Sequence, residues 1–454
     1  MHIKLTILSY GLGMENAAPN FAAKRDFVRA SLTPVEWLGV LIGIVMPVVS
    51  AIVYPTYMHT MPTVALEWSR LLEAPFVLCE IAVIFWAMRT GMDSTKVWKN
   101  FPWDIKIATS VLTVGVFASS LFISAEPQRS ITMSIITLIH GLFAVSVYHL
   151  FRSSNASDFR PFVHLLGAGL FLLAILTYWR FAFPPPASQV LGGQIEWGSA
   201  LPGFISVRHF GSWTGAIAAG FLASLMYRED IKRFSLVHIL YLASAAMTVW
   251  SGTRAAVLAI FITGIILLLL NRKIPSFRNI AVIAVLTGAA LTIAWSLLPY
   301  NDPTFLLYTL ADTAGADQMT GGRLGLWGAT FDRWQESPLF GWGTGSVFWE
   351  VYVGWTHTQP HNAILQFLIS WGFAGAVPAI WLLGRAIVSA HRIAAQNQAL
   401  QPMLAILYTL LLMSLLEGML HYPRFIMLII IAFAAIFAFD ISHSDRTVSK
   451  VGKT

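Results

Sequence analysis

Long apolar segments separated by short polar connections occupy most of the chain after its first residues. A helix needs about 20 mainly apolar residues to cross the roughly 30 Å hydrocarbon core of a bilayer. Segments of this kind lie at 35–55, 71–89, 105–124, 131–151, 161–181, 209–227, 235–250, 255–270, 279–298, 362–384, 403–420 and 424–441. We therefore predict an all-α polytopic integral membrane protein with about twelve transmembrane helices. An even number of spans places both termini on the same side.

The same pattern divides the chain into five regions. We expect a cytoplasmic N-terminal tail, a bundle of about nine spans, a large loop outside the membrane, three further spans and a cytoplasmic C-terminal tail. These regions cover residues 1–34, 35–298, 299–361, 362–441 and 442–454. The length of the loop and its glycine, proline and tryptophan content predict short helices lying on the membrane.

The composition agrees with this architecture and excludes a soluble multidomain protein. Hydrophobic residues make up 56% of the chain and charged residues only 11%, whereas soluble domains carry about 25% charged residues. The single cysteine, Cys79, excludes a disulfide within the chain. No cleaved signal peptide is predicted, because the apolar N-terminal patch lacks a convincing cleavage site.

The net charge of +7 is explained by the positive-inside rule, without any nucleic-acid partner. With the N-terminus in the cytoplasm, 21 of the 29 basic residues lie in cytoplasmic segments, and every such segment has at least two. Eight basic residues remain on the outer side, and all are arginines: Arg70, Arg129, Arg180, Arg208, Arg254, Arg323, Arg333 and Arg424. Because arginine binds phosphate through two parallel hydrogen bonds, this face suits a ligand that carries phosphate. The alternative is that arginines such as Arg129 only reach the interface from helix ends.

Three residues at the outer ends of predicted spans are candidates for chemistry. Arg208 lies where a Pro/Gly-rich loop, 182–208, enters a span. Arg254 follows a tight turn near Ser251, because 235–270 is too long for one span. His361 follows Pro360, which predicts a helix beginning near His361 or Asn362 and so an imidazole at a helix N-terminus. The alternative for each of these residues is a structural role, in which the side chain anchors a helix end at the membrane interface.

The stretch 321–375 is the longest segment that is neither a span nor a short connection. Its His357 and His361 are four residues apart, but Pro360 intervenes and no H-E-x-x-H pattern is present, so we predict no metal and no cofactor. The glycines of FGWGTGS, at 341, 343 and 345, do not fit G-x-G-x-x-G. They favour a tight turn that lets the backbone approach a ligand or a helix.

Acidic residues within predicted spans are a further set of candidates, since ionisable groups in a membrane are functional suspects. Glu73 and Glu80 share a helix face, and Glu417 lies near the outer end of the eleventh span. The alternative is that each of them pairs with an arginine or makes a polar helix contact. We also expect Tyr422 and Arg424, in the last outer turn, to line the same cavity as Arg208 and His361.

An ordered set of short motifs links these residues. It consists of R-x3-W at 323–327, P-x2-G-x-G-x-G at 338–345, HN-x2-L at 361–365 and G-x2-G at 372–375. The order of these motifs and their side of the membrane resemble the O-antigen ligase and polymerase superfamily of bacterial envelope enzymes. The motif-specific part covers about 55 residues, and the remainder of the resemblance is topological.

The resemblance implies a glycosyltransferase-C-like fold in the bacterial inner membrane. It also implies an inverting, metal-independent transfer from a glycan on undecaprenyl pyrophosphate at the periplasmic face. Arg208 and Arg254 would hold the pyrophosphate, His361 would position or deprotonate the acceptor hydroxyl, and Arg323 would contact donor or acceptor. We expect Arg424, Tyr422 and Asn362 to contact substrate as well.

Several acceptors and functions are compatible with this pattern. A ligase passes the polymer to lipid A-core, a polymerase passes it to another lipid-linked repeat of an O-antigen or exopolysaccharide, and a third group glycosylates protein. We rank the ligase first. An ion-coupled transporter using Glu73 and Glu80 is a different class of function. Its inverted repeats are not evident in the sequence.

Overall fold

The computed structural model describes residues 32–60, 73–182, 190–191, 194–195, 201, 203–204, 206–227, 234–297, 323–345 and 359–451. The chain divides into two compact units, Met1–Leu32 and Thr33–Thr454. The second unit is the helical bundle described below. The expected N-terminal tail lies almost wholly outside the described residues, as do His357 and Arg70.

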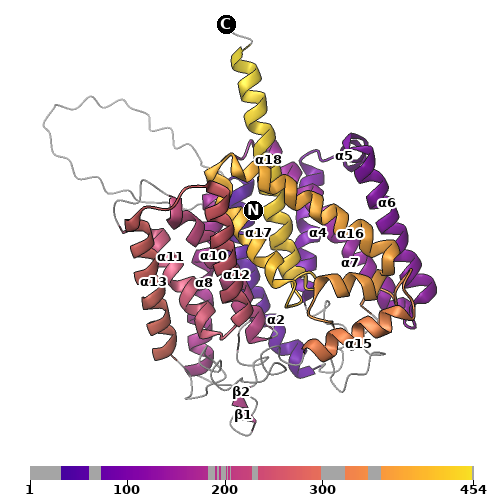
Figure 1. Ribbon diagram of the computed structural model, residues 1–454, viewed down its shortest axis with the longest axis horizontal. Helices are drawn as coiled ribbons and strands as arrows, with labels where there is room; N and C mark the ends of the chain where they lie inside the picture. Colours follow the sequence, from indigo (N-terminus) through magenta and orange to yellow (C-terminus); the bar gives the residue numbers. More distant parts are fainter. Residues whose placement is uncertain are drawn as a thin grey trace, which may run out of the picture. The chain divides into compact units, whose positions relative to one another are not determined.

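The predicted all-α architecture is confirmed, because a helix occupies each of the twelve apolar segments (Figure 1). In chain order, the helices of the first half are α1 (Pro34–Val40), α2 (Met46–Thr60), α4 (Ala74–Arg89), α5 (Ser94–Asn100), α6 (Trp103–Ala118), α7 (Pro127–Ser153) and α8 (Arg160–Ala182). Those of the second half are α10 (Val207–Tyr227), α11 (Leu236–Trp250), α12 (Arg254–Asn271), α13 (Phe277–Ser296), α15 (Arg323–Gln335), α16 (Ala363–Ala395), α17 (Gln401–Met413) and α18 (Pro423–Val451). One π-helical turn, Leu41–Val45, joins α1 to α2, and another, Ser119–Ile123, follows α6.

A short hairpin is the one strand pair within the described residues. In it β1 (Val190–Leu191) pairs antiparallel with β2 (Gln194–Ile195). It lies in the loop that we expected at 182–208. Several helix starts follow from the sequence, because proline, whose fixed backbone angle suits the first helical turn, begins α1, α7 and α18.

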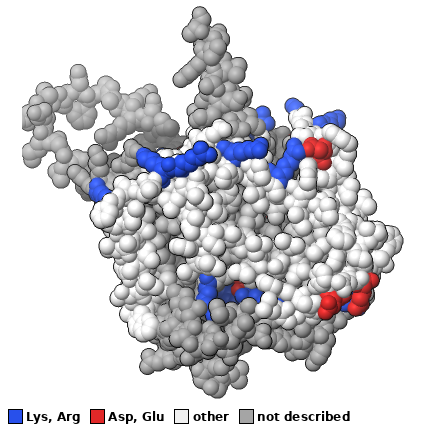
Figure 2. Space-filling model, in the orientation of Figure 1, with Lys and Arg blue, Asp and Glu red and all other residues white. Residues whose placement is uncertain are grey.

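Seven helices are long and apolar enough to cross a membrane, within the described residues, and the number rises to eight if α4 and α5 form one bent span. The helices α11, α17 and α18 contribute shorter apolar stretches. A multi-pass membrane protein is therefore supported, while the number twelve stays a prediction. On the face in view, Figure 2 shows a wide band without charged residues between two charged edges, as a membrane-embedded surface requires.

Helix α10 is enclosed within the bundle, with contacts to α8, α11, α12, α13 and α17. Nearly every side chain from His209 to Met226 on this helix is buried. Small residues allow the close approach of its neighbours: a methyl group on Gly220 would meet Ile406 of α17 at 3.1 Å. The residues at its first turn, Arg208 and His209, are therefore held on a rigid element.

The ends of α16, α17 and α18 differ most from the prediction, and α18 runs to Val451 and not to 441. Helix α17 ends at Met413 and not at 420, so Glu417 lies in the connection to α18. Helix α16 extends to Ala395, beyond the predicted 384, and breaks at Gly372, whose φ of 55° and ψ of −163° are not helical. Hydropathy alone did not indicate these boundaries, because apolar residues continue through the α17–α18 connection.

The break in α16 is bridged by the glycine-rich turn that follows α15. Trp342 and Gly343 donate backbone hydrogen bonds to the carbonyls of Ile369 and Ser370, at 2.8 and 2.9 Å. In return, the backbone N–H of Phe373 donates to the carbonyl of Pro338 at 2.8 Å. The glycines at 341, 343 and 345 thus form a turn that approaches a helix, which is one of the two alternatives expected from their spacing.

Candidate active site

A buried carboxylate joins two of the predicted site residues. Glu417, which is 4% exposed, forms an ion pair through Oε1 with the guanidinium of Arg323. Its Oε2 lies 3.3 Å from Nδ1 of His361. Arg323 begins α15, His361 precedes α16, and Glu417 follows α17, so three separate elements meet here. We call these three residues the Glu417 cluster.

The charge of Glu417 is maintained by its neighbours. Burial alone would raise the pKa of this carboxyl group, but the hydrogen bond from His361 and the positive charges of Arg323, His361 and Arg208 outweigh it. The net result is a pKa lowered to about 2. Glu417 is therefore an ionised acceptor at neutral pH, and it orients both of its partners.

His361 adopts an unusual backbone conformation. Its φ of 54° lies in the left-handed region, which a non-glycine residue seldom adopts. Strain of this kind persists only where the surroundings impose it, and it concentrates at functional sites. The surroundings here include the Glu417 contact, and Gln359 Nε2 at 3.3 Å from His361 Nδ1.

The residues around His361 fix the start of α16. Asn362 is the N-cap: its Oδ1 accepts from the backbone N–H groups of Ile364 and Leu365, and its Nδ2 donates to the carbonyl of Leu415. The indole of Trp327 donates to the carbonyl of Pro360 at 2.8 Å. The helix therefore begins at Ala363, and the side chain of Asn362 is engaged in capping it.

Arg208 and Arg254 lie on neighbouring helix starts. Arg208 is in the first turn of α10, and Arg254 is the first residue of α12 after the turn at Ser251–Thr253, as the sequence predicts. The hydroxyl of Thr253 donates to the carbonyl of Val207 at 3.5 Å and so ties the two starts together. Neither guanidinium forms an ion pair or a hydrogen bond within the described part of the chain. We call Arg208 and Arg254 the arginine pair.

The arginine pair and the Glu417 cluster belong to one site. Arg208 is close enough to Glu417 to influence its charge. His209, which is buried next to Arg208 in α10, interacts electrostatically with both Glu417 and His361. Hence α10 carries Arg208 towards the cluster, and the hydrogen bond of Thr253 holds the start of α12, with Arg254, next to the start of α10.

Arg424 and Tyr422 are buried and are not exposed at the surface of the molecule. Arg424 is 2% exposed, its Nε lies 3.2 Å from Glu73 Oε1, and its guanidinium donates to the carbonyl of Gly203 at 2.5 Å. The ring of Tyr422 packs edge-on against His209, with 4.2 Å between centroids. The substrate contact expected for these two residues stays a prediction, and their burial favours a supporting role.

The two other acids found by sequence have separate partners. Glu73 bonds to Arg424 as above and also accepts from the Arg424 backbone N–H at 2.8 Å. Glu80 lies 2.7 Å from Nδ1 of His140 on α7. Both carboxylates are fully buried. Pairing, which was the structural alternative, therefore describes both.

Sequence reasoning singled out His361, Arg208, Arg254 and Arg323 and placed Trp327 in a motif, but it gave no role to Glu417 and missed Gln359 and His209. The only signal for Glu417 was an acid near the end of an apolar segment. Within the described ranges, no group of three or more His, Cys, Asp or Glu side chains could hold a metal ion.

Comparison with known proteins gives two matches. Residues 239–380, which include Arg254, Arg323 and His361, match a family model described as O-Antigen ligase. The O-antigen ligase of Salmonella typhimurium (strain LT2) is 30% identical over 146 residues, which represent 30% of this chain and 35% of that relative. No solved structure matches. The motifs, the multi-pass helical architecture and these two matches together make the chain similar to the O-antigen ligase superfamily, and the matched region spans about a third of the curated relative.

Proposed function

We propose that this protein is a membrane glycosyltransferase. It transfers a glycan from polyprenyl pyrophosphate, in bacteria undecaprenyl pyrophosphate, to an acceptor hydroxyl at the outer face of the inner membrane. Lipid A-core is the acceptor that we place first. The observation that carries the proposal is the arginine pair, which has no partner in the described chain, together with the charge interaction of Arg208 with the buried carboxylate that holds His361.

The arginine pair is suited to the pyrophosphate of the donor. Two guanidinium groups on neighbouring helix starts can each bind a phosphate bidentately. The helix N-termini add positive potential at the same place. Negative charge grows on the pyrophosphate as the glycosidic bond breaks, so these groups stabilise the transition state more than the ground state.

His361 is suited to the acceptor. A base that is oriented by a carboxylate through one ring nitrogen can take a proton at the other. The acceptor oxygen attacks the anomeric carbon from the side opposite the pyrophosphate, and its proton passes to the imidazole. The bond from the anomeric carbon to the pyrophosphate oxygen breaks, and polyprenyl pyrophosphate leaves. Such a displacement inverts the anomeric centre and involves no metal.

The other residues of the site act around these groups. Arg323, paired with Glu417, is in position to contact donor or acceptor while it holds the carboxylate in place. Asn362 fixes the turn that carries His361. Arg424 holds the carbonyl of Gly203, which precedes α10, and Tyr422 packs against His209 of α10. Both termini of the protein are in the cytoplasm under the topology that we infer.

The experiment is complementation of a strain that lacks the gene. If the protein is a ligase, the deletion leaves long lipid-linked polymer and bare core, and the wild-type gene restores polymer on core. His361→Ala, Arg208→Ala and Arg254→Ala should each lower transfer by about 100-fold or more at equal protein level. Arg152→Ala is the matched control, because this exposed arginine lies at the end of α7 that is predicted to face the cytoplasm. This variant should restore transfer in the deletion strain.

The outcomes separate the alternatives. Single repeats on core in the deletion strain would identify a polymerase. Loss of glycan from protein would identify a protein glycosyltransferase. Full complementation by all three site variants would overturn the site assignment, whichever glycan is transferred.

A further inference from the structure

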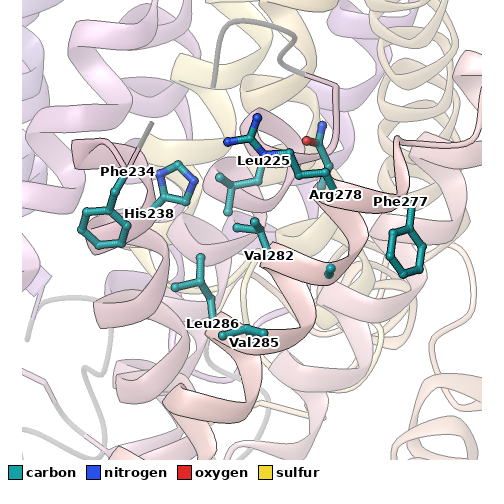
Figure 3. Close-up of a pocket in the computed structure, with 10 residues that line it drawn as sticks. Leu225, Phe234, His238, Phe277, Arg278, Val282, Val285 and Leu286 are labelled. Carbon is teal, nitrogen blue, oxygen red and sulfur yellow. The ribbon is translucent and has the colours of Figure 1, made fainter. Parts of the chain in front are cut away.

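A pocket at the end of the bundle opposite the candidate active site has a positively charged side chain at its mouth and an apolar wall. It has a volume of about 590 Å³ and lies between the end of α10 and the starts of α11 and α13 (Figure 3). Its wall is formed by apolar side chains, including Leu225, Val282, Val285 and Leu286. Its polar groups are His238, Arg278 and Asn279. By the positive-inside pattern this end faces the cytoplasm.

His238 presents a directed hydrogen-bond donor to this pocket. The residue is 4% exposed, and its Nδ1 accepts from the backbone N–H of Ser235 at 3.1 Å. Because Nδ1 is the acceptor, the proton of the neutral ring resides on Nε2. Nε2 makes no hydrogen bond to any other described residue. A donor of this kind at the wall of a pocket can bind an acceptor from a ligand or water.

Arg278 supplies the charge at the mouth of the pocket. It is exposed at the start of α13, and Figure 3 shows its guanidinium extending over the pocket towards the His238 ring. Asn279 ties α13 to α10 through a hydrogen bond from its Nδ2 to the carbonyl of Met226 at 3.1 Å, which holds the arginine in place. The rim also carries Phe277, which is 86% exposed, and Phe234, which is 70% exposed. Large exposed apolar side chains at a charged rim are expected where the surroundings are lipid.

We propose that this pocket binds one anionic phospholipid of the cytoplasmic leaflet. The headgroup phosphate accepts from Arg278 and from His238 Nε2, and one acyl chain lies along Val282, Val285 and Leu286. Three observations favour this occupant. The charge is positive, the wall below it is apolar, and the pocket lies at the membrane end where the sequence concentrates basic residues, among them Arg272 and Lys273. Basic pockets between helices on this side of a membrane recognise anionic headgroups.

The test measures retained lipid by native mass spectrometry of the purified protein after exchange into micelles containing phosphatidylglycerol or phosphatidylcholine. We expect the wild type to retain one phosphatidylglycerol in preference to phosphatidylcholine. Arg278→Gln should weaken retention about fivefold, since one arginine near the headgroup contributes that much. Ala281→Trp, which fills the pocket and keeps the charge, should also weaken it. The control is Arg89→Gln, which removes an exposed arginine from the end of α4, outside this pocket.

The opposite results would overturn the proposal. Equal retention of the two lipids would show that the protein does not prefer an anionic headgroup. Unchanged retention in Arg278→Gln and Ala281→Trp would show that the lipid binds outside this pocket. Inorganic phosphate supplies a further arm. If phosphate alone displaces the bound lipid at millimolar concentration, the site recognises a free anion. Glycan transfer at the other end of the bundle is measured separately, so either proposal can fail without the other.

Discussion

Glu417 is the residue on which the candidate site depends most. One buried carboxylate holds a guanidinium on one oxygen and an imidazole on the other. If one member of a buried group of charges is removed, the remaining charges stay out of water without a counter-ion. The loss of stability is then larger than the net stability that the intact group contributes. The residue therefore combines a structural role with a role in orienting His361.

We predict that Glu417→Gln lowers both stability and transfer. The unfolding free energy should fall by about 3 kcal/mol, because Arg323 loses its buried counter-ion. Transfer should fall further than stability explains, since His361 loses its orienting partner. Thermal unfolding and single-turnover transfer on the same preparation check this. Wild-type transfer in the variant would show that Glu417 does not orient the base.

The pH dependence of the same variant provides a separate prediction. The folded-state pKa of Glu417 is about 2 against an ordinary value of 4.5. Because the pKa is lower in the folded state, ionised Glu417 stabilises the fold fully above about pH 4.5. This contribution to the free energy of unfolding is lost as the pH falls towards 2. The difference in melting temperature between wild type and Glu417→Gln should therefore narrow as the pH is lowered from 6 to 3. A difference that stays constant over this range would contradict the ion pairing.

At the scale of elements, the break in α16 is the feature that places the site. The turn at 338–343 inserts its backbone at the break and satisfies the hydrogen-bonding groups that the kink exposes. Gly372 allows this because it has positive φ and no side chain, whereas a Cβ there would collide with the backbone of Leu339 and Phe340. The glycine motifs are thus structural, and they connect α15, which carries Arg323, to α16, which follows His361.

We predict that Gly372→Ala destabilises the protein by about 2 kcal/mol or more, through backbone strain and overpacking. The matched control is Gly384→Ala in the same helix, where an added Cβ meets nothing within 4 Å. That substitution should be neutral or stabilising by up to about 1 kcal/mol, as alanine favours a helix. Thermal unfolding in detergent compares the two variants. Equal stability would show that the turn does not constrain the break.

For the molecule as a whole, the membrane topology is the property that relates the two ends of the bundle. The candidate active site belongs to the end predicted to face outward, and the lipid pocket to the end predicted to face the cytoplasm. Two introduced cysteines can test this, because the native Cys79 is only 6% exposed. Gln128, in the first turn of α7, and Gln398, between α16 and α17, are exposed and are expected on opposite sides.

We predict that a membrane-impermeant thiol reagent labels Gln128→Cys in cells whose outer membrane has been permeabilised, and labels Gln398→Cys only after lysis. The unmodified protein is the background control. Labelling of both positions in unlysed cells, or of Gln398→Cys alone, would contradict the topology of twelve spans with cytoplasmic termini.

The amino-acid sequence was enough to predict the helices and to select residues suited to phosphate and proton chemistry. Membrane helices need only local apolar length, and an arginine at a helix start is visible without knowing its neighbours. Tertiary structure alone decided which of those residues act together. Arg323 and Glu417 are 94 positions apart, so their ion pair depends on how α15 and the end of α17 pack. The tertiary structure also distinguishes Arg208 and Arg254, which have no partner among the described residues, from Arg424, which is buried and paired. Burial and pairing depend on how the helices pack, and the sequence does not show them.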